Sequence, residues 1–241
     1  MDEQTAARLL ALNRDFYTNF AQSFSASRPA GRLNMEAIAP YLHGASKVLD
    51  VGCGNGRLAD RLDHDGWPLH YVGVDAIPEL IAIAAARQPR LRHLTAEFLV
   101  ADITVPSWAQ SLRDHAPFDT ILLLAVLHHI PGGDGRRAVL DDLHALLRPG
   151  GILLMSNWQF THSERLRRKI VPWGEVGINE SDVEPGDALL SWRRGGVAHR
   201  YCHWLTEAEV ESLAAQSGFQ VIAQFYAEAN LNLYSALTRI A

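Results

Sequence analysis

Two neighbouring groups of residues in this chain have the types and spacing to bind a nucleotide-like ligand. Gly52, Gly54 and Gly56 alternate with other residues directly after a short apolar run that begins at Val48. Because glycine lacks a Cβ, it adopts positive φ readily and lets a ligand lie against bare main chain. A second apolar run ends at Asp75, where doubly wound folds place the acid that binds ribose hydroxyls. Together the two groups predict a cofactor site.

The glycine spacing also narrows the cofactor. A dinucleotide fingerprint has a third glycine three residues after the second, under the pyrophosphate, and Arg57 occupies that position here. The spacing therefore disfavours NAD or FAD and favours a ligand without phosphates. The alternative is an ordinary strand-to-helix turn, with each acid a surface carboxylate that closes a strand.

Adjacent histidines at His128 and His129 follow the fourth predicted strand and are candidate proton acceptors. Imidazole titrates near neutral pH, although this alone does not make a histidine a base. Neighbouring residues of a helix or strand point in different directions, so one histidine is expected to pack while the other faces the cleft. We favour His129 as the cleft residue.

The elements that must position these residues follow from the hydrophobic pattern. Strand-like runs alternate with helix-like segments, which predicts a parallel sheet. A capping pattern at Thr206 begins a last helix, and two further runs are expected to complete the sheet as a hairpin. The predicted fold is α/β, a doubly wound, Rossmann-like seven-stranded sheet that is mostly parallel with a C-terminal antiparallel hairpin. The predicted strands are Val48–Gly52, Tyr71–Asp75, Phe98–Asp102, Thr120–Leu127, Ile152–Asn157, Phe219–Tyr226 and Leu231–Thr238, and the helices include Pro78–Arg87 and Arg136–Leu147.

We predict that residues 1–241 form a single domain with two additions. Residues 1–45 are expected to form a helical cap, in which Phe16 and Phe20 pack against the core and Tyr17 closes the site. Residues 159–203 show weak periodicity, several glycines and prolines, and arginines mixed with tryptophans. This composition predicts an irregular insertion that forms a lid over the substrate cleft.

Composition excludes several classes of protein. The chain has 241 residues, 48% hydrophobic and 20% charged, and its apolar runs are too short to cross a bilayer. Two cysteines fit a reducing cytoplasm better than a disulfide framework. No metal is expected, because the eleven histidines show no metal-ligand spacing. The formal charge of −5 gives no general attraction to nucleic acid.

The pattern Asp50-x-Gly52-x-Gly54-x-Gly56, followed by Asp75 and by Asp102 within Ala101–Ile103, resembles the motifs of class I S-adenosylmethionine-dependent methyltransferases. The resemblance implies that S-adenosylmethionine is the cofactor, with the glycine loop against its methionine part. It implies further that Asp75 binds the ribose and Asp102 the adenine amino group. The cofactor-binding residues expected on this basis are Tyr17, Asp50, Gly52, Cys53, Gly54, Asn55, Gly56, Asp75, Ala76, Asp102, Ile103 and Ala125.

Three further segments are similar to the wobble-uridine (carboxymethyluridine) tRNA methyltransferases: Phe20–Arg28, Ala125–His129 and Arg200–Glu207. This resemblance implies methylation of a carboxylate on modified tRNA, and that family has a Trp-Pro after the arginine where this chain has Pro29-Ala30. A carboxylate is already anionic and needs a cation to orient it, for which a guanidinium is suited. The expected catalytic residues are His129, Arg28 and Arg200, with Arg193 as a further candidate cation.

Other functions stay open at this point. Acidic residues in the insertion nearly balance its arginines, which suits a small-molecule O- or N-methyltransferase as well as a tRNA enzyme. A non-catalytic S-adenosylmethionine-binding subunit and a dehydrogenase are the remaining alternatives. The acceptor is therefore expected to be tRNA or a small molecule, with no membrane and with a small activating partner subunit as a possibility.

Overall fold

The computed structural model describes residues 1–26, 33–193 and 196–240. Arg28, predicted to orient the acceptor, lies outside these residues. Among the residues described, no helix combines the length and apolar character that crossing a bilayer requires.

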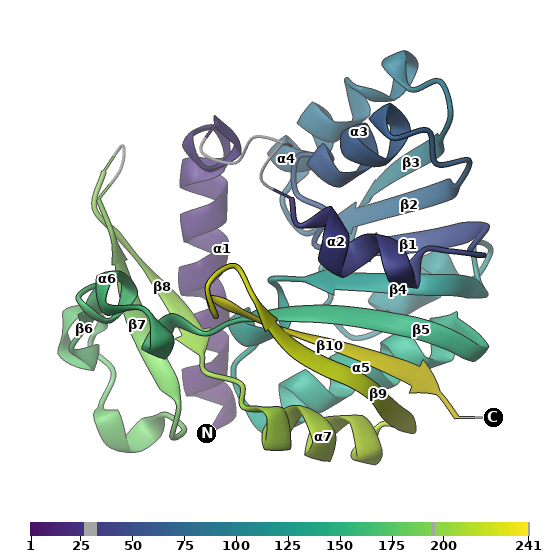
Figure 1. The fold of residues 1–241 in the computed structure, drawn as a ribbon. Coiled ribbons are helices and arrows are strands. Elements are labelled where there is room, and N and C mark those ends of the chain that lie inside the picture. The colour runs from purple at the N-terminus through teal and green to yellow at the C-terminus, as the bar shows by residue number, and fades with distance from the viewer. Residues whose placement is uncertain (27–32, 194–195, 241) are drawn as a thin grey trace.

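The core of the molecule is a seven-stranded sheet in the order β3-β2-β1-β4-β5-β10-β9 (Figure 1). The first five strands in this order run parallel, and β10 pairs antiparallel with both β5 and β9. The predicted α/β fold with its C-terminal hairpin is thus confirmed. The strands are β1 Lys47–Val51, β2 His70–Asp75, β3 Thr95–Val100, β4 Phe118–Leu124, β5 Leu147–Trp158, β9 Phe219–Ala227 and β10 Asn232–Arg239.

Helices cover both faces of this sheet because successive strand residues point to opposite sides. Val48 and Leu122 belong to the cluster that packs under α2 and α3. Leu49 and Ile121, one residue away in each strand, belong to the cluster under α5 and α7. The main helices are α1 Glu3–Ala26, α2 Met35–Ile38, α3 Arg57–His64, α4 Pro78–Ala85, α5 Gly133–Leu146, α6 Glu164–Arg167 and α7 Glu207–Gln216. Short 3₁₀ turns are η2 Ala39–Tyr41, η3 Gln88–Arg90, η4 Trp108–Leu112, η5 Leu127–His129, η6 Phe160–His162, η7 Trp173–Val176 and η8 Glu180–Asp182.

Helix α1 stands across the carboxyl ends of the strands, between the large sheet and a second, smaller one (Figure 1). Phe16 is buried, as predicted, and its ring contacts Phe20 and Trp192. Asn13 is also buried and bonds to the second sheet: its Oδ1 accepts from the Tyr201 backbone N–H at 2.9 Å, and its Nδ2 donates to the Tyr201 carbonyl at 3.2 Å. Helix α1 therefore packs directly against the small sheet.

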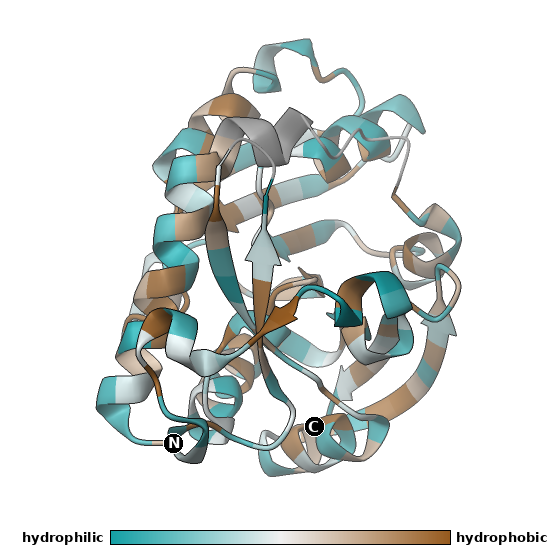
Figure 2. Cartoon of the chain, turned by 90° about the vertical axis from the view of Figure 1, so that its left-hand side faces the viewer, coloured by the Kyte–Doolittle hydropathy of each residue, from teal (hydrophilic) through white to brown (hydrophobic). Residues whose placement is uncertain are grey.

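The prediction that residues 159–203 are irregular is wrong for the parts of this segment that form strands. It contains a three-stranded antiparallel sheet of β6 Ile170–Val171, β7 Asp187–Trp192 and β8 Ala198–His203. Figure 2 views the molecule from the side of this small sheet, beside α1 with its alternating teal and brown bands. Residues of β8 from Arg200 to His203 are all buried, so β8 lacks the polar–apolar alternation that reveals a half-exposed strand.

A buried cluster of charges joins the small sheet to α5 and α7. Arg136 on α5 forms ion pairs with Glu184 at 2.8 Å and Glu209 at 3.1 Å. His203 on β8 bonds through Nδ1 to Asp187 at 2.6 Å and through Nε2 to Glu209 at 3.0 Å. Burial opposes the charged imidazole, but the bonds to the two carboxylates outweigh burial and raise the pKa of His203. A carboxylate only accepts, so both ring nitrogens of His203 donate.

This raised pKa predicts a pH-dependent contribution to stability. A group whose folded-state pKa exceeds its unfolded value stabilises the fold fully below the unfolded pKa, about 6.5 for histidine, and progressively less above it. We therefore expect His203→Gln to lower the free energy of unfolding most at about pH 6 and least at about pH 9. Urea denaturation of both proteins across this range measures the difference. His199→Gln, on the same strand, is the control, and a His203 effect that is constant with pH would contradict the charged state.

Candidate active site

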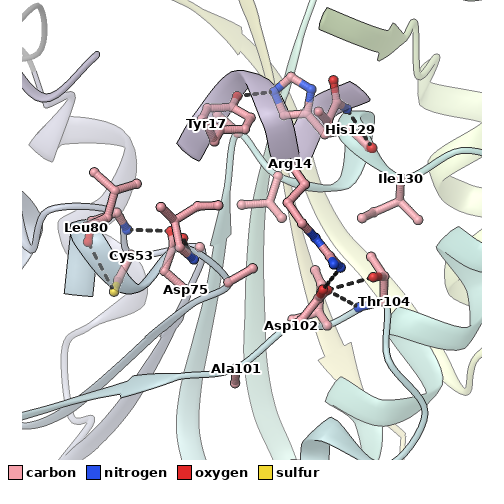
Figure 3. Close-up of a pocket in the computed structure, with 18 of the residues that line it drawn as sticks. Arg14, Tyr17, Cys53, Asp75, Leu80, Ala101, Asp102, Thr104, His129 and Ile130 are labelled. Atoms are coloured by element: carbon pink, nitrogen blue, oxygen red, sulfur yellow. Dashed lines mark hydrogen bonds and ion pairs between the residues drawn. The ribbon is translucent and has the colours of Figure 1, made fainter. Parts of the chain in front are cut away.

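The candidate site is a cavity of about 210 Å³ at the carboxyl ends of β1, β2 and β4, with α1 as its cover (Figure 3). The chain reverses its strand order between β1 and β4, and ligands of open α/β sheets bind at this switch point. Eleven of the predicted residues line the cavity: Tyr17, Gly52, Cys53, Gly54, Asn55, Asp75, Ala76, Asp102, Ile103, Ala125 and His129.

The glycine loop is held against the end of β2 by its main chain. The N–H groups of Gly52 and Cys53 both donate to the Val74 carbonyl, at 2.8 and 3.0 Å. Gly52 has φ +74°, and a Cβ there would lie 2.4 Å from Val126 Cγ2. Gly54 has φ +58°, and a Cβ there would meet no protein atom within 4 Å. The loop therefore packs tightly at Gly52 and offers bare main chain to open space at Gly54.

Asp75 both fixes this loop and faces the cavity. One carboxylate oxygen accepts from the Gly54 N–H and the other from the Ile77 N–H, each at 2.9 Å. Burial raises the pKa of Asp75 above its ordinary value. Each carboxylate oxygen has a second lone pair, so Asp75 can also accept bonds from ribose hydroxyls.

Asp102 lies at the opposite end of the cavity and already has partners. One oxygen accepts from the Thr104 backbone N–H at 3.0 Å and its hydroxyl at 2.6 Å. The other oxygen pairs with Arg14 of α1, whose side chain is 58% exposed. An adenine amino group would share this second oxygen with Arg14. The ion pair therefore ties α1 to the acid predicted to bind adenine.

His129, rather than His128, faces the cavity, as the sequence favoured. His129 Nδ1 lies 3.0 Å from the Tyr201 carbonyl, and Nε2 lies 2.9 Å from the Tyr17 hydroxyl. Because a carbonyl oxygen can only accept, Nδ1 carries the proton and Nε2 accepts from Tyr17. His128 is fully buried and its Nδ1 accepts from the Trp158 backbone N–H at 3.4 Å.

Asp50 and Gly56, predicted to contact the cofactor, do not line the cavity. Asp50 is buried behind the loop, where it accepts from the Tyr71 hydroxyl, and burial raises its pKa to about 6. A Cβ on Gly56 would lie 2.9 Å from Ala84 Cβ, so this glycine allows α3 and α4 to pack closely. Both residues therefore support the glycine loop on the side away from the cavity.

Arg200 does not line the cavity either, but the aromatic rings around it contact residues that do. Its guanidinium carbon lies 4.7, 4.9 and 5.3 Å from the ring centroids of Phe16, Trp158 and Trp192. Phe16 contacts the ring of Tyr17, and Trp158 that of His129. Arg200 is 4% exposed, and its Nε and Nη1 have no hydrogen-bond partner within the described part of the chain. Aromatic faces stabilise the cation but leave these donors unsatisfied.

The remaining half of the lining was not identified from the sequence. On α1, four lining residues share one face: Leu10, Asn13, Arg14 and Tyr17. Their spacing at i, i+3, i+4 and i+7 would have predicted this shared face from the sequence. The other residues follow strand ends or loops and carry no pattern of their own. The full set is Leu10, Asn13, Arg14, Arg57, Ile77, Leu80, Ala101, Thr104, Leu124, Val126 and Ile130.

Two groups of potential metal ligands occur in the described residues, and donor atoms in each already have partners within the protein. In the group of His128, His129 and Cys202, both nitrogens of His129 have protein partners, and burial raises the pKa of Cys202 to about 12. In the group of Glu184, Asp187 and His203, the Arg136 guanidinium already supplies the cation.

The cavity fits S-adenosylmethionine by the chemistry of its lining. Gly54 leaves open space where a side chain would intrude, Asp75 can accept from ribose hydroxyls, and Asp102 lines the cavity beside Thr104 and Arg14. Asp75 and Asp102 are carboxylates, and neither is replaced by a phosphate-binding lysine. This pair suits a nucleoside without phosphates.

Comparison with known proteins agrees with this fit. Residues 20–224 match the family described as "Methyltransferase domain". A ubiquinone biosynthesis O-methyltransferase of Xylella fastidiosa is 38% identical over 126 residues, which is 52% of this chain and 46% of that protein. A tRNA (carboxymethyluridine(34)-5-O)-methyltransferase of Arabidopsis thaliana is 28% identical over 178 residues, 73% of this chain and 40% of that protein. The chain thus spans less than half the length of these two curated relatives.

Among solved structures, a SAM-dependent methyltransferase from Methanosarcina mazei is similar, with a TM-score of 0.63 and 23% identity. The alignment covers 84% of this chain and 96% of that one. At this level of identity the likeness shows the fold.

The geometry at Asp75 predicts its contribution to ligand binding. We expect Asp75→Ala to weaken S-adenosylhomocysteine binding by about 1–3 kcal/mol, because bonds to a charged acceptor are lost. Isothermal titration calorimetry measures this loss. Asp63→Ala is the control, since Asp63 likewise accepts backbone N–H bonds, three of them, but lies outside the cavity. Equal affinity of wild type and Asp75→Ala would show that Asp75 does not bind the ligand.

Proposed function

Because the chain belongs to the S-adenosylmethionine-dependent methyltransferases, we propose that it methylates a carboxylate oxygen, with the carboxymethyl group of a tRNA wobble uridine as the acceptor. The observation that carries this proposal is Arg200, a buried guanidinium with unsatisfied donors and no carboxylate partner among the described residues. A buried cation of this kind is costly unless an anion joins it. The similarity to a tRNA (carboxymethyluridine(34)-5-O)-methyltransferase supports the same acceptor.

The chemistry divides between the cofactor and the residues around it. When bound, S-adenosylmethionine supplies an electrophilic methyl group on a sulfonium whose departing product is a neutral thioether. The protein's task is then to align the acceptor oxygen and exclude water. Arg200 can hold a carboxylate with paired bonds, while Trp158 and Trp192 beside it offer faces on which a base can stack.

The basic residues of the 159–203 insertion do not form a broad positive surface for RNA. Arg165, Arg167 and Arg168 are all exposed, but Arg168 is paired with Glu164 and Arg167 donates to the Thr161 carbonyl. An acceptor is therefore expected to be recognised by the buried Arg200 and its rings more than by a broad basic surface. The N-terminal helix α1 and the small sheet beside it form the proposed lid of this acceptor site.

A second candidate function is methylation of a hydroxyl, and the Tyr17–His129 pair favours it. A hydroxyl acceptor must lose a proton, and the Tyr17 oxygen can take it while the Tyr17 proton passes to His129 Nε2 at 2.9 Å. The methyl group then joins the acceptor oxygen. The similarity to a ubiquinone biosynthesis O-methyltransferase supports this candidate.

The product of the reaction tests the acceptor class. We expect labelled methyl from S-adenosylmethionine to enter total tRNA and to be released as methanol by mild alkali, because methyl esters hydrolyse under these conditions. Transfer only to molecules of a metabolite extract, in an alkali-stable form, would contradict the carboxylate acceptor and support the hydroxyl candidate.

Two variants at one position test the role of Arg200. Arg200→Met should lower kcat/KM for the acceptor by about 10- to 100-fold, which corresponds to losing charge-assisted bonds, and Arg200→Lys should lose less. S-adenosylhomocysteine affinity, measured by calorimetry, should stay at the wild-type value in both and so reports an intact cofactor site. Full activity of Arg200→Met would contradict a carboxylate contact.

One substitution separates the two acceptor classes. Tyr17→Phe should reduce turnover of a hydroxyl acceptor by about 10²- to 10⁴-fold, because proton transfer is lost, but should affect a carboxylate acceptor far less. Rates are compared with saturating cofactor, so that any change in cofactor affinity is removed. A similar loss for both acceptors would contradict a proton-accepting role for this pair.

A further inference from the structure

Asn13 on α1 uses its amide to join two backbone segments beside the cavity. It lines the cavity and is 6% exposed. Its Oδ1 accepts from the Tyr201 backbone N–H at 2.9 Å, and its Nδ2 donates to the carbonyls of Tyr201 and His129, each at 3.2 Å. An amide nitrogen carries two protons, so these bonds use both donors and the acceptor oxygen. Asn13 therefore connects β8 to η5, the turn that carries His129.

The Tyr201 backbone can bond to Asn13 because β8 lies at the edge of the small sheet. In an antiparallel pair, alternate residues direct both of their backbone groups away from the partner strand. Tyr201 is such a residue, since its N–H and its carbonyl both bond to Asn13. Buried edge groups need a partner other than water. The Asn13 amide is that partner, and it bonds to β8 as a further strand would.

The Tyr201 carbonyl is also the group that orients the ring of His129. It accepts from Asn13 Nδ2 and lies 3.0 Å from His129 Nδ1. A carbonyl oxygen has two lone pairs, and these two donors use both. The Cys202 sulfur lies 3.6 Å from the same nitrogen, but a thiol is a weaker partner than a carbonyl. With the proton on Nδ1, Nε2 accepts from the Tyr17 hydroxyl at 2.9 Å.

We propose that Asn13 is a positioning residue that keeps the proton of His129 on Nδ1 and directs Nε2 toward Tyr17. It acts through the Tyr201 carbonyl, which it holds in place, and through the backbone of His129. In the other tautomer, lone pairs of Nδ1 and of the carbonyl oxygen would face each other. The consequence for the reaction rests on the second candidate function, in which Nε2 takes the proton that leaves Tyr17. The tautomer itself does not depend on the acceptor.

¹⁵N NMR of the imidazole measures the tautomer without an acceptor, because protonated and unprotonated ring nitrogens resonate far apart. The signals of His129 are those absent from His129→Gln. At about pH 9, above the ordinary titration range of imidazole, we expect Nδ1 to carry the proton in the wild type. Asn13→Asp keeps the acceptor for the Tyr201 N–H but loses both donors. It should shift the ratio of tautomers toward protonated Nε2 by about 2- to 10-fold.

Arg8→Met is the matched control, because Arg8 also ties α1 to the insertion. Its Nη2 donates to the carbonyls of Val176 and Gly177, at 3.0 and 2.9 Å. These carbonyls belong to η7 and the residue after it, and not to β8 or η5. Arg8→Met therefore loosens the same helix without removing a bond to Tyr201 or His129, and it should keep the wild-type ratio of tautomers.

Three results would overturn the positioning role. They are a wild type with the proton on Nε2, an unchanged ratio in Asn13→Asp, and an equal shift in Arg8→Met, which would reduce Asn13 to a general attachment of α1. If Asn13→Asp does not fold, Asn13→Ala carries the same comparison. Methyl transfer to a carboxylate alone would reject the second candidate function, and the NMR spectra, recorded without an acceptor, distinguish that failure from this one.

Discussion

The site depends on one constraint, the reversal of the chain directly after β1. The N–H groups of Gly52 and Cys53 share the Val74 carbonyl, and the Gly54 N–H bonds to Asp75 at the end of β2. This arrangement needs positive φ and leaves no room for a Cβ at Gly52. It turns the main chain away from the sheet edge and opens the space that a nucleoside can occupy. The carboxylate that holds the loop is also the one that faces the ligand.

Helix α1 completes the site because three neighbouring side chains on one face bond to three different parts of the fold. Asn13 bonds to the small sheet through Tyr201, Arg14 pairs with Asp102, and Tyr17 bonds to His129. The cofactor cavity, His129 and the small sheet that carries Arg200 thus all contact α1. We infer that the cover over the cofactor and the acceptor site are mechanically joined, since displacement of α1 would break all three contacts.

The sequence predicts the large sheet well, because its central strands β1, β2 and β4 are apolar on both faces and its turns carry glycine and proline. It also identifies the loop, Asp75, Asp102 and His129, whose positions after strand ends bring them to one edge. It does not predict the strands of the small sheet, where Arg200 is buried against Phe16 and Trp158, far along the chain. Nor does it reveal that Arg14 meets Asp102, 88 residues away, because ion pairs across such distances leave no local pattern.

We infer that a sulfonium nucleoside binds between the glycine loop and α1. A crystal structure with S-adenosylhomocysteine tests this most directly, because it locates every part of the ligand at once. We expect both ribose hydroxyls to lie within hydrogen-bond distance of Asp75, with the amino-acid part of the ligand along Gly52–Asn55 beneath α1. Ligand density elsewhere on the molecule, or a ribose without contact to Asp75, would contradict it.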